Sequence, residues 1–343
     1  MSNQSCCSWA VWHRASSPTV LPSASVGGTL SVGDRLARIR FRLGMSRMKL
    51  VVTPGLYALN DPGPEDPVLV TANFRLSFDA LRSALGERSA WILVLDTKGV
   101  NVWCAAGKGT FGTNELIHRI RNSSLADIVS HRRLILPQLG APGVAAHEAE
   151  QQTGFRVQYG PVEARDLPAY LDAGMQATAA MRTKQFPLMD RLELIPLELV
   201  QSWKIWLPLA TLSALLSLLL NGLPSLSPLS DAAPALLGVA AGAILTPALL
   251  PWIPGRSFAL KGGIVGVVLS SACLLLFPAG IGRGIFTVAA ATAAASFLAL
   301  NFTGATTFTS PSGVKREMRI ALPVQGALLV AAVAGRIAAE LLT

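Results

Sequence analysis

The chain has 343 residues, of which 51% are hydrophobic and 14% are charged, and its formal net charge is +9. Its mean hydropathy is +0.46, which is too apolar for a purely soluble protein, and its length allows two domains. The four cysteines do not make a disulfide framework, because Cys273 lies within an apolar segment, and they fit a reducing compartment for the polar part.

The first 30 residues are rich in serine and have no periodic pattern. They contain no apolar stretch typical of a secretory signal, so residues 1–30 are predicted to be a disordered leader. Cys6 and Cys7 could bind a soft metal such as Hg(II), although an unstructured leader is the favoured interpretation. The basic run from Arg35 to Lys49 could contact nucleic acid, but a solvated or membrane-facing surface is favoured, and no nucleic-acid partner is predicted.

Residues 31–180 are predicted to form an α/β domain with a Rossmann-like, mostly parallel sheet, because strands and helices alternate. The predicted strands are 67–71, 91–95, 133–136 and 155–159, and the predicted helices are 77–85, 101–120 (with a glycine-rich break), 144–153 and 166–173. Ligands of such sheets lie beyond the carboxyl ends of the strands. Thr71 and Asn73 are therefore candidates for hydrogen bonds to a ligand, and as an equally weighted alternative they are turn and N-cap residues.

The most informative segment is Asn101–Thr113, with the sequence NVWCAAGKGTFGT. Asn101 is a good N-cap residue, and Cys104 follows in the first turn, where the helix dipole favours a thiolate. Ala105, Ala106 and Gly107 carry almost no side chain, so we expect a bare helix surface that a large flat partner can approach closely.

Three interpretations of Cys104 compete at this point. The first is a buried structural cysteine on an ordinary helix. The second, a phosphate loop around Gly107 and Lys108, fails because Val102 and Gly109 stand where that motif requires a glycine and a hydroxyl. The third is a metal or cofactor ligand. Since no other Cys or His lies within ligand spacing, a zinc site is disfavoured, and a lone thiolate suits a metal whose other positions a macrocycle fills.

Residues 181–204 are predicted to be a linker, and 205–343 a transmembrane domain of about five helices. The apolar segments are 205–220, 232–250, 262–277, 285–302 and 322–342, each close to the length that spans a bilayer. Basic residues concentrate in alternate loops, which places the α/β domain in the cytoplasm of a multi-pass inner-membrane protein and the C-terminus outside. The polar run Thr303–Gly313 falls on the cytoplasmic side, where it could line a reaction space or be a loop of hydroxyl groups.

The segment Asn101–Thr113 resembles the cap-helix signature of the membrane-bound corrinoid protein of microbial mercury methylation. That family is related to the corrinoid domain of the large subunit of the corrinoid iron–sulfur protein of acetyl-CoA synthesis. The resemblance spans roughly residues 31–343. It extends over the segments VGDRL (32–36), PGLY (54–57), VTANF (70–74), SFDALR (77–82) and FTGATT (302–307).

The resemblance implies a corrinoid (cobalamin-type) cofactor with Cys104 as the lower axial ligand of cobalt. No histidine lies in the D-x-H-x-x-G pattern of other cobalamin domains, and no multi-cysteine run suggests an iron–sulfur cluster. The predicted corrinoid contacts are Thr71, Asn73, Asn101, Val102, Trp103, Cys104, Ala105, Ala106, Gly107, Lys108, Gly109 and Thr110.

The resemblance further implies a methyltransferase that transfers a methyl group from cobalt to inorganic Hg(II), giving methylmercury. The implied partners are a ferredoxin-like electron donor with two [4Fe–4S] clusters and a methyltetrahydrofolate-linked methyl donor. Two alternatives stay open: a corrinoid methyl carrier with another physiological acceptor in one-carbon metabolism, and a non-enzymatic membrane docking protein.

Overall fold

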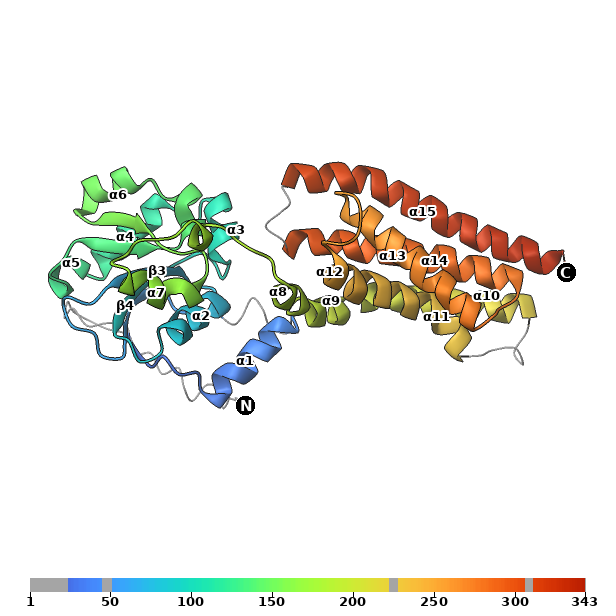
Figure 1. Cartoon of the computed structure of the whole chain (residues 1–343), viewed down its shortest axis with the longest axis horizontal. Coiled ribbons are helices and arrows are strands. Elements are labelled where there is room, and N and C mark those ends of the chain that lie inside the picture. The colour runs from blue at the N-terminus through green and yellow to red at the C-terminus, as the bar shows by residue number, and fades with distance from the viewer. Residues whose placement is uncertain (1–23, 45–50, 222–227, 306–310, 343) are drawn as a thin grey trace, which may run out of the picture. The chain divides into compact units, whose positions relative to one another are not determined.

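The computed structural model describes residues 24–44, 51–221, 228–305 and 311–342 (Figure 1). The described chain divides into two compact units. The first, the sheet unit, comprises residues 24–35 and 51–183. The second, the helical unit, comprises residues 36–44 and the described residues from Lys184 onward.

The sheet unit is built on six strands in the order β1-β2-β4-β3-β5-β6. Strands β3, β4, β5 and β6 run parallel, whereas β2 pairs antiparallel with β4 and β1 runs parallel to β2. The predicted mostly parallel α/β sheet is therefore confirmed, and the sheet is mixed rather than fully parallel. The strands are β1 (Ala24–Val26), β2 (Gly55–Leu59), β3 (Val68–Ala72), β4 (Ala90–Leu95), β5 (Arg133–Leu136) and β6 (Arg156–Tyr159).

Two of these strands were not predicted from the sequence. Strand β1 lies within the predicted leader, where Ala24–Val26 join the edge of the sheet. Strand β2 is flanked by the turn-forming residues Pro54 and Asp61-Pro62-Gly63-Pro64, so its five residues resemble a loop in the sequence. Its pairing with the buried strand β4 supplies the hydrogen bonds that a short strand cannot provide alone.

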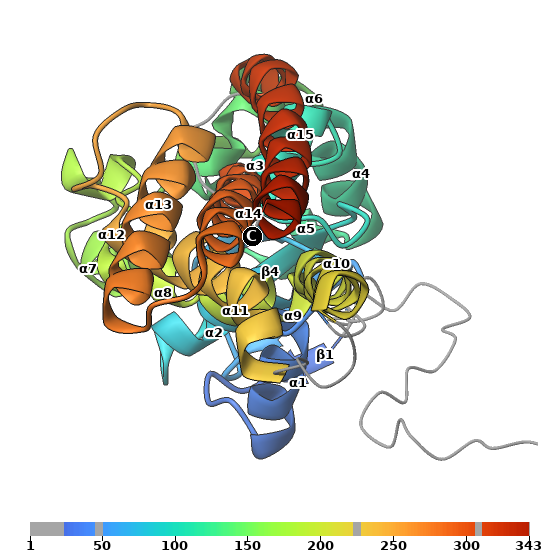
Figure 2. The same cartoon turned by 90° about the vertical axis from the view of Figure 1, so that its right-hand side faces the viewer.

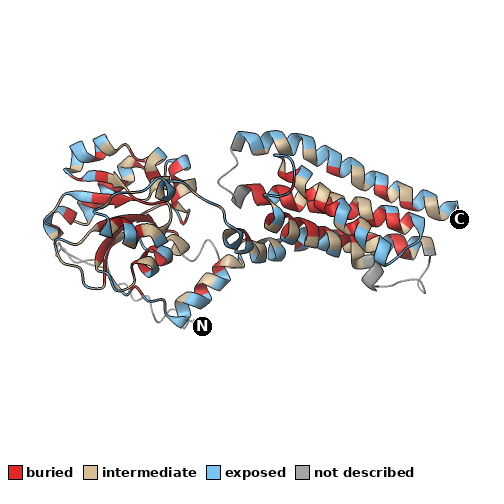
Figure 3. Cartoon of the chain, viewed as in Figure 1, coloured by how far each residue is buried: buried red, intermediate tan, exposed pale blue. Residues whose placement is uncertain are grey.

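Helices cover both faces of the sheet, which leaves β3 and β4 buried along their whole length (Figure 3). The predicted helix 101–120 is divided at its glycines into α3 and α4. The helices that the sheet unit contains or begins are α1 (Val32–Arg42), α2 (Arg75–Leu85), α3 (Val102–Lys108), α4 (Thr113–Asn122), α5 (Leu125–Ile128), α6 (Ala146–Thr153) and α7 (Leu167–Asp172), with short 3₁₀ segments η1 (Gln138–Gly143), η2 (Ala164–Asp166) and η3 (Ala180–Arg182).

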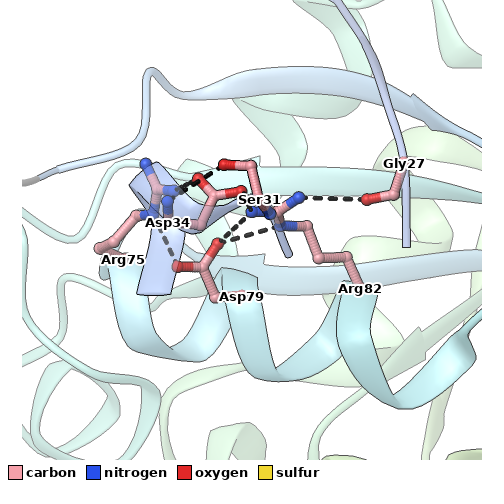
Figure 4. Close-up of polar contacts among 6 residues, drawn as sticks. All are labelled: Gly27, Ser31, Asp34, Arg75, Asp79 and Arg82. Atoms are coloured by element: carbon pink, nitrogen blue, oxygen red, sulfur yellow. Dashed lines mark hydrogen bonds and ion pairs between the residues drawn. The ribbon is translucent and has the colours of Figure 1, made fainter. Parts of the chain in front are cut away.

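A buried ion-pair network joins the start of α1 to α2 (Figure 4). Asp34 pairs with Arg75 and Arg82, and both arginines also pair with Asp79, whose side chain is fully buried. Arg82 donates a further hydrogen bond to the carbonyl oxygen of Gly27 (3.1 Å). Burial raises the pKa of Asp34, but hydrogen bonds from Arg82 and Ser31 outweigh that effect and hold the pKa at about 2. The carboxylate is therefore ionised wherever the protein is folded near neutral pH.

The helical unit contains five helices long and apolar enough to cross a membrane among the described residues, which confirms the predicted number of apolar helices. These segments are Trp203–Leu220, Ala232–Leu249, Phe258–Leu276, Ile281–Asn301 and Ser312–Leu341. The unit's helices are α8 (Leu188–Leu192), α9 (Ile195–Gln201), α10 (Trp203–Asn221), α11 (Pro228–Val239), the π-helical η5 (Ala240–Leu245), α12 (Thr246–Leu249), α13 (Phe258–Leu276), α14 (Ile281–Asn301) and α15 (Pro311–Leu341), with the short η6 (Phe302–Ala305). The predicted linker 181–204 thus contains η3, α8 and α9.

Helix α14 is the central helix of this bundle, with α11, α13 and α15 around it (Figure 2). Its small residues let the neighbours approach closely: a Cβ atom on Gly262 of α13 would lie 2.5 Å from the carbonyl oxygen of Ala295, and one on Gly266 would lie 2.8 Å from Cα of Thr292. Of the polar run Thr303–Gly313, residues 306–310 lie outside the described residues, so the structure does not test its predicted role.

Candidate functional site

Helix α3 presents Cys104 on an exposed stripe at the carboxyl edge of the parallel strands. Trp103 and Cys104 are half-buried, while Gly107 and Lys108 are exposed one turn later. Residues three and four apart share a helix face, so Gly107 and Lys108 lie beside Cys104. A Cβ atom added to Gly107 would meet no atom within 4 Å, which leaves open space next to the thiol.

Both ends of α3 are fixed by local sequence. The side-chain oxygen of Asn101 accepts the backbone N–H of Cys104 at 2.9 Å, as expected for an N-cap residue. Gly109 ends the helix in the left-handed conformation, with φ of 76°, and its N–H bonds back to the helix carbonyls. The position of Cys104 in the first turn therefore follows from the residues at 101 and 109.

The structure corrects the interpretation of Ala105 and Ala106. Both side chains are buried, with Ala105 fully inaccessible, so neither contributes to a bare surface. Gly143 of η1 packs directly on Ala106: a Cβ atom on Gly143 would lie 3.0 Å from Cα of Ala106 and 2.1 Å from the carbonyl oxygen of Phe111. The small side chain of Ala106 allows the close approach of η1 to α3, and the exposed residues of this segment are Gly107, Lys108 and Gly109.

A cavity of about 290 Å³ lies beside the start of α3. Thr71 at the end of β3 lines it together with Asn101, Val102 and Trp103, four of the predicted contact residues. The rest of its wall comes from α2 and from the loops that follow β5 and β6, including Phe74, Ser77, Pro137, Leu139, Gly160, Pro161 and Glu163. These two loops follow predicted strands, so they agree with the rule that ligands lie beyond the carboxyl ends of the strands. The residues that α2 contributes depend on how that helix packs.

Asn73 has a different position from the one expected for a ligand contact. Its side chain is buried, and its Oδ1 atom lies 3.1 Å from the N–H of Thr97, 2.9 Å from the N–H of Gly99 and 2.8 Å from the Thr97 hydroxyl. Its Nδ2 group donates to Asp96 at 3.2 Å. These contacts use the amide within the protein, so Asn73 organises the loop that leads into α3, in line with the alternative of a turn residue.

Two residues that the sequence analysis did not identify, Glu115 and Gly99, also stabilise this loop. Glu115 of α4 accepts the backbone N–H of Asp96 at 2.8 Å and also pairs with Arg119. Gly99 has a positive φ of 71°, and a Cβ atom there would lie 2.6 Å from the side chain of Val51. Only glycine fits this position, because both the backbone conformation and the neighbour exclude a side chain. A glutamate one helix away gives no local signal for this role.

We expect Asn73→Ala to loosen the entry to α3. The substitution leaves the N–H groups of Thr97 and Gly99 without an acceptor, and each buried unpaired donor costs roughly 1–3 kcal/mol. Hydrogen exchange of residues 96–104 should accelerate by at least about tenfold, since 1.4 kcal/mol corresponds to that factor. Asn114→Ala, an exposed asparagine on α4, is the matched control. Unchanged exchange in Asn73→Ala would refute the organising role.

The other titratable and thiol groups that the structure describes form no cluster suited to a metal ion. Within the described parts of the chain, no three His, Cys, Asp or Glu side chains lie close enough to hold a metal ion. His131 lies 2.9 Å from the carbonyl oxygen of Asp66, and His118 lies 2.9 Å from Asn122. The pair Cys6-Cys7 lies outside the described residues, and the hypothesis of a metal site there stays untested.

The sheet unit has recognisable relatives, and the match includes Cys104. Residues 45–171 match the family of the CO dehydrogenase/acetyl-CoA synthase delta subunit. The matched segment extends from before β2 to Leu171 in α7 and contains none of the five apolar helices.

The similar curated proteins are gamma subunits of the acetyl-CoA decarbonylase/synthase complex. The acetyl-CoA decarbonylase/synthase complex subunit gamma of Archaeoglobus fulgidus is 36% identical over 128 residues, which are 37% of this chain and 27% of the relative. The gamma subunit of Methanothermobacter thermautotrophicus is 34% identical over 128 residues (37% and 28%), and that of Methanopyrus kandleri is 33% identical over 123 residues (35% and 26%). The chain thus spans only about a quarter of the length of the curated relatives it matches.

These relatives correct one expectation and confirm another. The resemblance to the mercury-methylation family was wrong as a functional assignment, because the matches are to subunits of the acetyl-CoA decarbonylase/synthase complex, and Hg(II) is withdrawn as the methyl acceptor. The predicted cofactor class is confirmed, since the matched family is one of corrinoid-binding subunits. The exposed stripe around Cys104, with its open space at Gly107, fits the approach of such a large planar group.

Proposed function

We propose that this chain is a membrane-anchored corrinoid protein that carries a methyl group in one-carbon metabolism. The observation that carries the proposal is the position of Cys104. It lies on an exposed stripe at the carboxyl edge of the parallel strands, within the segment that matches corrinoid-binding subunits. Ligands of parallel α/β sheets bind at this edge.

The residues around Cys104 have separate roles in this proposal. A bound corrinoid would supply a cobalt centre that accepts and releases the methyl group. Cys104 would hold the cobalt from the protein side, because a thiolate is a soft, anionic, electron-donating ligand. Asn101 fixes the first turn of α3, Gly107 leaves room beside the thiol, and the loop held by Asn73 positions the helix.

The partners follow from the chemistry of a methyl carrier. A methyl donor of the methyltetrahydrofolate class would load the protein, and a different one-carbon acceptor would receive the group. If the bound cobalt were oxidised, its return to the state that accepts a methyl group would need a low-potential electron donor. For this role we propose a ferredoxin-like protein with two [4Fe–4S] clusters. The named relatives are subunits of a complex, which supports a function in association with other proteins.

We also propose that the helical unit spans the cytoplasmic membrane. Its five apolar helices have 18 to 30 residues, enough to cross a hydrocarbon core of about 30 Å. Basic residues gather at one end of the bundle, at Lys204, Arg256, Lys261, Lys315 and Arg316, whereas Arg283 lies at the other end. Because cytoplasmic loops carry an excess of positive charge, this distribution supports a cytoplasmic position for the first end, to which Lys204 and the preceding chain belong.

The proposal is tested by cofactor binding to the purified full chain. After incubation with hydroxocobalamin and desalting, we expect stoichiometric cobalt and an absorption spectrum that differs from that of the free corrinoid. Cys273→Ala should bind in the same way, because Cys273 lies in α13 of the helical unit. A chain that retains no cobalt would exclude the methyl carrier and favour the docking alternative.

A further inference from the structure

A large groove lies within the helical unit between α13, α14 and α15. Its volume is about 930 Å³, three times that of the cavity beside α3. Apolar side chains of α13 and α15 form most of its walls, including Val267, Val268, Ile320, Val324 and Leu328. The described residues leave this groove unfilled.

One end of the groove is cationic. Arg256, which precedes α13, and Arg316 of α15 line this end and are both exposed. Neither arginine has an ion-pair partner among the described residues. Glu317 also lines the groove, but its carboxylate accepts hydrogen bonds from the Ser257 hydroxyl (2.8 Å) and the Ala259 N–H (2.7 Å) at the start of α13 and pairs with neither arginine in the described structure. Two arginines and one glutamate leave this end with a net positive charge. The positive charge at the groove's end is therefore available to an anionic group.

The length of the groove matches one leaflet of a bilayer. On α15 it extends from Gly313 to Leu328, which corresponds to about 22 Å along the helix. Half of a bilayer with its headgroups measures about 20–22 Å. The charged end and the apolar walls then lie at the depths of a lipid headgroup and its acyl chains.

The charge distribution favours the cytoplasmic leaflet and an anionic lipid. Arg256 and Arg316 belong to the basic end of the bundle, and the cytoplasmic leaflet carries the negative surface potential to which arginines are attracted. A zwitterionic lipid would bind less favourably, because the cationic group of its headgroup repels the arginines. The complementarity of charge therefore distinguishes one class of occupant.

We propose that this groove is a binding site for one anionic phospholipid, whose phosphate contacts Arg256 and Arg316 and whose acyl chains lie along α13 and α15. The inference rests on the proposed insertion of the helical unit into a membrane and is independent of the corrinoid.

Native mass spectrometry of the full chain in detergent tests the site. With phosphatidylglycerol and phosphatidylcholine of the same acyl chains, we expect retention of one phosphatidylglycerol per protein in preference to phosphatidylcholine. Arg256→Gln with Arg316→Gln should weaken phosphatidylglycerol binding about thirtyfold, at about 1 kcal/mol for each of the two arginines. Lys315→Gln with Arg319→Gln removes the same charge from exposed residues of α15 that do not line the groove, and should leave binding unchanged.

Filling the groove provides a second measurement. A Cβ atom on Gly263 would meet only Cγ2 of Thr292, at 4.0 Å, so Gly263→Leu should fit and exclude the acyl chain. Ala272→Leu, on the exposed face of α13, is its control.

Three results would overturn the lipid site. The first is equal retention of phosphatidylglycerol and phosphatidylcholine. The second is an equal loss of phosphatidylglycerol binding in the Arg256/Arg316 double variant and in the Lys315/Arg319 control. The third is a loss of lipid retention caused by Thr292→Val. The Thr292 hydroxyl lies in the groove wall and has no hydrogen-bond partner among the described residues, so such a loss would indicate a ligand whose polar group lies deep between the helices. Because lipid retention is measured without cobalt, its failure leaves the cofactor test unaffected.

Discussion

Cys104→Ala is expected to abolish methyl transfer while the protein stays folded. The thiolate is the only ligand we propose from the protein to cobalt, and alanine removes both its charge and its sulfur. A loss of about 100-fold or more in the rate of methyl transfer corresponds to about 2.7 kcal/mol of lost transition-state stabilisation. The fold should persist, because Cys104 is half-buried and its side chain makes no hydrogen bond in the described structure.

The measurement pairs single-turnover methyl transfer with the absorption spectrum of the cobalamin-loaded protein. The spectrum of Cys104→Ala should change in the bands sensitive to the axial ligand. Cys273→Ala controls for the loss of a thiol elsewhere, and hydrogen exchange of β3 and β4 controls for folding. An unchanged spectrum and rate in Cys104→Ala would show that the thiolate does not ligate the cobalt.

Arg82→Met is expected to destabilise the sheet unit by about 3 kcal/mol, since breaking a buried ion pair leaves an uncompensated charge. Arg82 forms ion pairs with Asp79 and Asp34 and donates a hydrogen bond to the carbonyl oxygen of Gly27. Only 8% of its side chain is exposed. Asp79 is fully buried and would keep Arg75 as its sole ion-pair partner within the described network. Methionine retains much of the side-chain length, so the measured change reports mainly the lost charge.

Hydrogen exchange of the slowest amides in β3 and β4 measures this effect within the sheet unit alone. Arg88→Met is the matched control, because its ion pair with Asp172 is exposed and solvent screens it, so a much smaller change is expected. Without Arg82, Arg75 alone faces the two carboxylates of Asp34 and Asp79, which leaves one negative charge uncompensated. Adding Asp79→Asn to Arg82→Met removes that charge and should recover part of the stability. Equal effects in Arg82→Met and Arg88→Met would contradict the importance of the buried network.

The sequence predicted the parallel strands because their composition is locally unambiguous. Strands β3 and β4 are apolar on both faces, and their observed bounds differ from the predicted ones by one residue. It missed β1 and β2, whose strand conformation comes from pairing with residues distant in the chain. Likewise, the N-cap at Asn101 and the helix end at Gly109 are local signals, whereas the close approach of Gly143 in η1 to Ala106 is not.

The sequence by itself determined the α/β part, the five apolar helices and the candidate thiol at Cys104, because periodicity, capping and composition act over a few neighbouring residues. Only the tertiary structure decided that Asn73 holds a loop rather than facing a ligand, and that Arg82 joins two helices through a buried network. The groove between α13, α14 and α15 also exists only in the packed bundle. Such features depend on which distant side chains share a hydrogen bond or a surface, and no local pattern specifies that choice.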